Sequence, residues 1–138
     1  MNKNKHFGLK KLIPCYTDEG RCKFCRHKQC EWVLIADHAV ESLWVLAGVV
    51  LEPARERYGK PIRVVRAFVC WNKRKKLGLD WEYCQGECAD IRASRGDIEA
   101  ENKVLAKIIE ELGVADEVAI HEGFVHVVYK RRIRNAIG

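Results

Sequence analysis

Four cysteines near the start of the chain have a spacing that suits a metal ion. Cys15, Cys22, Cys25 and Cys30 follow the pattern C-x6-C-x2-C-x4-C. Two thiolates separated by two residues can reach the same tetrahedral zinc ion, and two further cysteines complete a structural site. The spacing therefore predicts a structural zinc ion. Disulfides are the alternative interpretation in an oxidising compartment, where the total of seven cysteines would leave one thiol over.

Basic residues form three groups whose chemistry suits contact with nucleic acid. One group lies among the cysteines from Arg21 to Lys28, and the others are Lys73 to Lys76 and Lys130 to Arg134. A basic zinc knuckle is one way of binding RNA. A solvated charged surface explains the same residues without a partner, and no module that stacks bases or reads a groove is recognisable. Nucleic-acid binding is therefore the third hypothesis about function.

Composition and charge limit the class of protein. The chain has 138 residues, of which 48% are hydrophobic and 32% charged, and this fits one soluble globular domain. Its net charge of +6 favours anionic partners such as nucleic acid, cell-wall polymer or a membrane surface. The longest apolar run, Trp44 to Leu51, is too short to span a membrane, and the basic N-terminus lacks the apolar core of a secretory signal. We expect synthesis in the cytoplasm, with later release by lysis or incorporation into a viral particle left open.

The sequence divides into a cysteine-rich, basic segment at residues 1–36 and a body at residues 37–138. We expect the regular secondary structure, which must position the candidate functional residues, in this body. Apolar residues at three- and four-residue steps from Val40 to Ala54 predict an amphipathic helix. Pro53 should kink this helix or start a new turn, and Gly59 should end it.

The middle of the body alternates strand and loop patterns before a second helix. Residues 62–69 are rich in β-branched side chains and predict a strand. Residues 72–86 lack periodicity and predict a long loop, and a short strand is expected at residues 88–91. A helix is predicted from Ile98 to Leu112, because Asp97 is a good N-cap and Gly113 a good C-terminal stop.

The body closes with a predicted hairpin. Residues 118–120 and 124–129 have strand patterns on either side of a turn at Glu122 and Gly123. The whole order of elements predicts an α+β domain with two main helices and a small, mostly antiparallel sheet.

Three stretches of the body contain recognisable motifs, at residues 51–64, 86–91 and 124–127. Together they resemble motifs of the zinc D-alanyl-D-alanine carboxypeptidase family, which includes many phage endolysins. Residues 51–64 (LEPARERYGKPIRV) are similar to the family stretch vLxPlRexyGkPIxV. Residues 86–91 (GECADI) are similar to the end of its signature S-x-H-x-x-G-x-A-x-D-I, and residues 124–127 (FVHV) to its closing W-V-H-I strand. Their order and spacing match as well, over about residues 37–130. The resemblance implies the family's fold and a link to cell-wall peptide.

The resemblance also assigns the residues of a zinc site. The family holds zinc with the signature His, the signature Asp and the His of the closing strand, and a nearby Glu acts as general base. Asp90 and His126 match two of these ligands, whereas Tyr83 stands where the signature His belongs. Glu122 is the candidate base, but it lies four residues before His126 where the family usually has three.

Two further positions depart from the family pattern. Trp81 replaces the signature Ser, and Val69 replaces the Arg that binds substrate in the family's SGYR segment. The resemblance therefore implies a damaged catalytic site.

Nearby cysteines offer a way to rebuild this site. Cys84 is adjacent to the missing ligand, and Cys88 is two residues from Asp90 and on the same face of a strand. Either thiolate with Asp90 and His126 would make an altered zinc site. The alternative is that Asp90 and His126 are relics, and that Cys70, Cys84 and Cys88 are core residues or form a disulfide.

Two hypotheses about function follow from these patterns. The first is a structural or interaction protein in which hydrolysis is lost, and it implies a protein partner or self-assembly. The second is an active zinc-dependent peptidase with a rearranged ligand set. In either case we expect Asp90 and His126 to face each other at the floor of a groove, with Tyr83 above them. We further expect this groove to lack metal.

Overall fold

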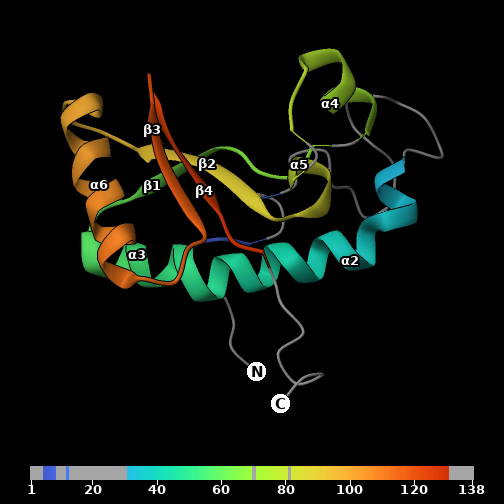
Figure 1. Ribbon diagram of the computed structural model, residues 1–138. Helices are drawn as coiled ribbons and strands as arrows, with labels where there is room; N and C mark the ends of the chain where they lie inside the picture. The colour runs from blue at the N-terminus through green and yellow to red at the C-terminus, as the bar shows by residue number, and fades with distance from the viewer. Residues whose placement is uncertain (1–4, 9–11, 13–30, 70, 81, 131–138) are drawn as a thin grey trace.

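The computed structural model describes residues 5–8, 12, 31–69, 71–80 and 82–130. It has an α+β fold in which a four-stranded antiparallel sheet packs against helices (Figure 1). Among the described helices, none combines the length and apolarity that a membrane crossing requires. The predicted fold class is therefore confirmed at the level of its helices and its antiparallel sheet.

A long helical segment runs along one side of the sheet. It consists of α2 (Glu31–Leu46), the π-helical turn η1 (Ala47–Leu51) and α3 (Glu52–Tyr58). Pro53 lies in the first turn of α3, where its missing N–H costs least, so the predicted new turn is present. Gly59 ends the segment in the left-handed conformation with φ of 74°, as predicted. The helix begins at Glu31, upstream of the boundary expected at residue 37.

The strands are β1 (Ile62–Arg66), β2 (Cys88–Ala93), β3 (Glu117–His121) and β4 (Phe124–Val128). Their spatial order is β1-β2-β4-β3, so the C-terminal hairpin pairs with β2 through β4. The register of β1 on β2 shifts between Val64 and Arg66, which indicates a β-bulge at Val65. The bulge matters for the site, because it decides which β1 side chain lies beside Asp90.

The core lies between the sheet and the helices. Helix α6 (Ile98–Leu112) packs beside α3, and it begins at Asp97 and ends at Gly113 as predicted. The Asp97 side chain accepts a hydrogen bond from the Ala100 N–H at 3.3 Å. Fully buried side chains on the helix-facing side of the sheet include Ala89, Ile91, Val125 and Val127. Since burying one Val or Ile side chain contributes about 1.5–3 kcal/mol, this face anchors the sheet.

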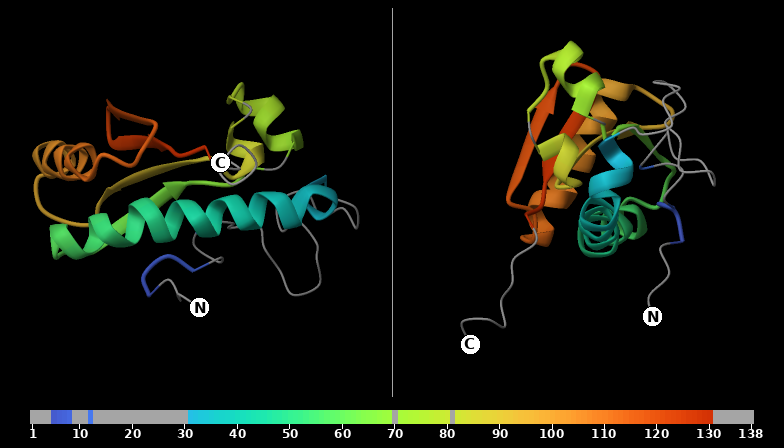
Figure 2. Two further views of the ribbon diagram at one scale, coloured as in Figure 1. Left: turned by 60° about the horizontal axis from the view of Figure 1, so that its bottom comes forward. Right: turned by 90° about the vertical axis from the view of Figure 1, so that its right-hand side faces the viewer.

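The opposite face of the sheet carries polar side chains and is bordered at one end by two short helices. These are α4 (Trp71–Leu77) and α5 (Glu82–Gln85), at the end of the molecule away from α6 (Figures 1 and 2). The prediction of a long loop over residues 72–86 is therefore wrong. Helices of 7 and 4 residues are too short to show a periodic pattern, and contacts with α2 hold them in place.

The chain also departs from the predicted strand at residues 67–69. Strand β1 ends at Arg66, because the next backbone groups bond to other segments. The Phe68 N–H donates to the Leu12 carbonyl at 2.9 Å, and the Val69 N–H donates to the Tyr83 carbonyl at 3.0 Å. The second bond ties the end of β1 to α5.

Two parts of the N-terminal segment join the core of the body. Phe7 and Leu12 are buried in the same cluster as the helix and sheet residues. The backbone N–H groups of His6 and Phe7 donate to one carboxylate oxygen of Glu52, at 2.7 and 2.9 Å. These residues run beside the long helix (Figure 2). The four cysteines of the predicted zinc cluster, Cys15, Cys22, Cys25 and Cys30, lie outside the described residues.

Candidate functional site

The sheet brings Asp90 and His126 together. They are direct cross-strand partners of β2 and β4, and Arg66 of β1 is the partner of Asp90 on its other side. Cross-strand partners project from the same face of a sheet, so the three side chains form a row. The prediction that Asp90 and His126 face each other is confirmed, whereas Arg66 was not predicted as a member of the site.

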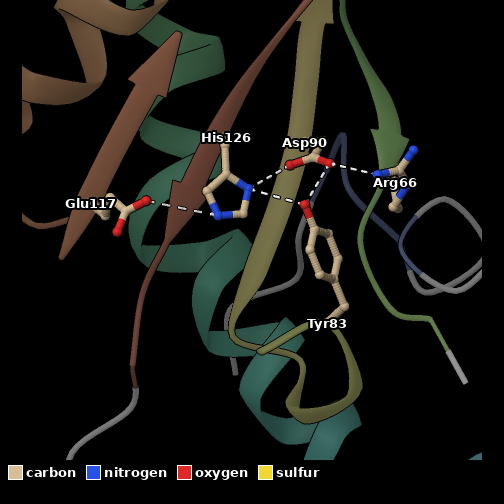
Figure 3. Close-up of polar contacts among 5 residues, drawn as sticks. All are labelled: Arg66, Tyr83, Asp90, Glu117 and His126. Carbon is tan, nitrogen blue, oxygen red and sulfur yellow. Dashed lines mark hydrogen bonds and ion pairs between the residues drawn. The ribbon is translucent and has the colours of Figure 1, made fainter. Parts of the chain in front are cut away.

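Hydrogen bonds converge on the carboxylate of Asp90, which is fully buried (Figure 3). Nδ1 of His126 lies 2.6 Å from Oδ1, and the Tyr83 hydroxyl donates to Oδ2 at 2.8 Å. The Arg66 guanidinium reaches Oδ2 at 3.4 Å. Both oxygens of the carboxylate therefore have protein partners.

Tyr83 reaches this carboxylate from outside the sheet. It lies on α5, and its hydroxyl oxygen is also 3.2 Å from Nδ1 of His126. At the end of α5, Gly86 has φ of 72°, and a Cβ at this position would lie 2.3 Å from the Ala39 carbonyl oxygen. Only glycine allows α5 to approach α2 this closely. The predicted position of Tyr83 over the Asp90–His126 pair is confirmed.

The cluster raises the pKa of two of its side chains, His126 and Tyr83. The hydrogen bond to Asp90 raises the pKa of His126 above 6.5, and this effect outweighs burial, which lowers the pKa. Negative charge on Asp90, Glu117 and Asp80 adds to the rise. Burial and the hydrogen bond to Asp90 raise the pKa of Tyr83 far above that of an ordinary phenol, so this side chain stays neutral.

A hollow of about 310 Å³ opens above the cluster. Glu117 of β3 lies on its wall, with Oε2 4.0 Å from Nε2 of His126. Sequence reasoning missed Glu117, although it alternates with Ala119, the β3 partner of His126, and therefore shares its face. The residues that line the hollow are Arg66, Gly78, Leu79, Asp80, Tyr83, Glu117, His121, Phe124 and His126.

Glu122, the candidate base, lies elsewhere. It is exposed in the turn between β3 and β4 and does not line the hollow. The acidic group beside Nε2 of His126 is Glu117 instead.

The candidate substitute ligands have different positions. Cys88 is buried and packs with Val69, Tyr83 and Val128. Cys84 lies on α5, but its side chain is outside the described part of the structure.

The donor set can be compared with that of a catalytic zinc site, which has three protein ligands. Asp90 and His126 supply two donors, and a neutral phenol is a poor third. Among the residues that the structure describes, no group of three His, Cys, Asp or Glu side chains is arranged to hold a metal ion. The described side chains therefore do not fit zinc, and no chemical step through a metal follows from them.

The remaining chemistry of the cluster is that of a histidine fixed by a buried carboxylate. Nδ1 of His126 is engaged by Asp90, which leaves Nε2 directed toward Glu117 (Figure 3). Among the described residues that line the hollow there is no Ser, Thr or Cys, so none of them offers His126 a hydroxyl or thiol of this kind to activate.

Comparison with protein-family models and with curated proteins gives no match. The resemblance to the zinc D-alanyl-D-alanine carboxypeptidases therefore stays a prediction from sequence motifs.

Proposed function

We propose that the chain is a non-hydrolytic relative of the zinc D-alanyl-D-alanine carboxypeptidases that serves as a structural or interaction protein. The observation that carries the proposal is the position of the Tyr83 hydroxyl, 2.8 Å from Asp90 and 3.2 Å from His126. By motif position, Tyr83 replaces the signature His. The hydrogen bond from Tyr83 to Asp90 thus replaces the bond that the signature His of the family makes to zinc.

The charges of the cluster support the same proposal. A fully buried carboxylate needs a compensating positive charge. In the family that charge is the zinc ion. Here Arg66 lies 3.4 Å from Asp90, and the raised pKa of His126 favours an imidazolium beside it. The protein's own side chains can therefore stabilise Asp90 without a metal.

Zinc stoichiometry tests the proposal directly. We expect Tyr83→His to gain one bound zinc ion per chain relative to the wild type, because it restores the third ligand of the family. The control Tyr83→His with His126→Ala should lose this gain. A wild-type chain that already binds a zinc ion dependent on His126 would contradict the proposal and favour the rearranged ligand set with Cys84 or Cys88.

Hydrolysis provides the second test. We expect the purified wild type to leave peptidoglycan and peptides ending in D-Ala-D-Ala uncleaved, with or without added zinc. Cleavage by the wild type that disappears in His126→Ala would overturn the proposal.

The cysteine cluster has a separate place in the proposal. We propose that Cys15, Cys22, Cys25 and Cys30 hold a structural zinc ion, on the basis of their spacing. Replacing Cys22 and Cys25 with Ser should remove one zinc ion per chain, while His126→Ala should not. Thiols that resist alkylation until a reductant is added would indicate disulfides instead.

A further inference from the structure

A second row of side chains crosses the open face of the sheet next to the Asp90 cluster. Arg63 of β1 is the direct partner of Arg92 of β2, and His121 of β3 is the direct partner of Phe124 of β4. Ile91 pairs with Val125, so the next step of the same register places Arg92 beside Phe124. The four side chains form an arginine–aromatic row: Arg63, Arg92, Phe124 and His121.

This row faces outward. Its neighbours along the strands, Ile62, Ile91 and Val125, are buried against the helices, and alternation directs the row to the other face. Arg63 and His121 are exposed, and Arg92 and Phe124 are half-buried. With neighbouring strands about 4.8 Å apart, the row extends roughly 14 Å across the sheet.

The two arginines have no acidic partner within the described part of the chain. Neither guanidinium makes an ion pair there, and the two lie directly opposite each other. Like charges in this position repel and destabilise a sheet. An anion that bridges them would remove the repulsion, so this end of the row is complementary to a phosphate or carboxylate.

The other end of the row is aromatic. The rings of His121 and Phe124 are stacked with centroids 4.9 Å apart and 13° between their planes. Both residues line the hollow above His126, so a planar group can approach them from that side. The hollow also contains the carboxylates of Glu117 and Asp80, which can accept hydrogen bonds from amino groups.

We propose that the arginine–aromatic row binds single-stranded nucleic acid. Phosphates contact Arg63 and Arg92, and a base stacks on Phe124 and His121. Proteins that bind single strands combine a basic track with aromatic platforms in this way. Exocyclic amino groups of bases donate to carboxylates, so Glu117 and Asp80 favour adenine, cytosine or guanine over thymine. An acidic peptide would satisfy the arginines but would leave the rings and the two carboxylates without a role.

Fluorescence anisotropy with labelled single-stranded 12-mers of dA and dT tests the proposal on the full chain. We expect binding of the dA strand at 50 mM salt and a linear fall of log K with log salt. Arg63→Gln with Arg92→Gln should weaken binding at least about tenfold and reduce the salt slope by about 2. Phe124→Leu, which keeps an apolar side chain but removes the ring, should weaken binding about tenfold and leave the slope unchanged.

The matched control removes two exposed lysines from α6, on the helical side of the molecule. Lys103→Gln with Lys107→Gln should change the affinity less than about threefold. No binding at 50 mM salt, or equal losses in the control and the arginine variant, would overturn the proposal. Heparin or an acidic peptide binding as tightly as the dA strand, without dependence on Phe124, would assign the row to another class of polyanion. Duplex DNA that binds the wild type as tightly as the dA strand does would also count against it, because paired bases cannot stack on Phe124.

Discussion

Two rows of side chains cross the same face of the sheet. On β2 they contain Asp90 and Arg92, which are two residues apart. The rows differ in whether their charged groups have partners of opposite charge within the described chain. In the first row Asp90 has Arg66 on one side, His126 on the other and the Tyr83 hydroxyl above. In the second row Arg63 and Arg92 lie opposite each other with no ion pair among the described residues. The first row is neutralised within the chain, while the second presents uncompensated positive charge.

The difference separates groups that hold the structure together from groups available to a ligand. Removing a member of the first row leaves a buried polar or charged atom without a partner, and this lowers stability. Removing either arginine of the second row relieves repulsion and leaves no buried polar atom without a partner. Substitution of Asp90 or Tyr83 and substitution of Arg63 or Arg92 should therefore change the free energy of unfolding in opposite directions.

The largest effect is expected at the centre of the first row. Asp90→Ala should lower the free energy of unfolding by about 3 kcal/mol or more, because it leaves Tyr83, His126 and Arg66 without their shared acceptor. Urea denaturation measures this loss. Glu117→Ala is the matched control, since this carboxylate also faces His126 but its side chain is 60% exposed; it should change stability by less than about 0.5 kcal/mol. Similar losses in both variants would remove the distinction between a buried and an exposed partner.

The next effect concerns the hydroxyl that replaces a metal ligand. Tyr83→Phe keeps the ring but removes the donor to Asp90, and it should lower the free energy of unfolding by about 1–3 kcal/mol. Tyr129→Phe serves as comparison, because the Tyr129 hydroxyl makes no hydrogen bond with the described residues. It should be nearly neutral. A neutral Tyr83→Phe would show that the hydroxyl contributes nothing to the cluster.

The pH dependence of stability tests the protonation of the first row. The folded-state pKa of His126 is raised, so its contribution is fully present below about pH 6.5 and is lost as pH rises through the folded pKa. Stability should therefore decline over this window in the wild type, and the decline should shrink in His126→Gln. Urea denaturation at several pH values, with the imidazole titration followed by NMR, measures both. A profile that is the same in the two proteins would contradict the assignment.

The smallest effect is expected in the second row and has the opposite sign. Arg63→Gln should raise the free energy of unfolding by about 0.2–1 kcal/mol, because it removes one of two like charges placed directly opposite each other. Lys103→Gln on α6 is the control for the loss of one exposed positive charge. A destabilised Arg63→Gln would show that the arginine has a compensating partner in the folded chain.

The sequence predicted the elements whose limits are set locally. Helix α6 and the C-terminal hairpin have clear signals in Asp97, Gly113 and the turn at Gly123, and the structure contains them within a residue or two of the predicted limits. The pairing of Asp90 with His126 also followed, but from the family resemblance rather than from periodicity.

The rest depends on tertiary contacts that no local pattern reveals. Helices α4 and α5 are held by α2, and the close approach at Gly86 depends on a backbone far away in the chain. Arg66 was missed because strict alternation from Val64 pairs Val65, not Arg66, with Asp90. Glu117 was missed because the register of β3 on β4 places it near His126, and the sequence does not specify this register.

The bulge at Val65 has a consequence for how this strand tolerates change in length. Val64 pairs with Ile91 and Arg66 with Asp90, so Val65 is the extra residue between two successive pairs of the ladder. Loss of the Val65 codon would join Val64 to Arg66 in a regular ladder and keep every other side chain on its present face. Deletion of a residue from β2, which has no bulge, would instead turn the residues beyond the deletion to the opposite face of the sheet. Val65 is thus the position in β1 at which relatives could lack a residue without a change in the faces of the other side chains.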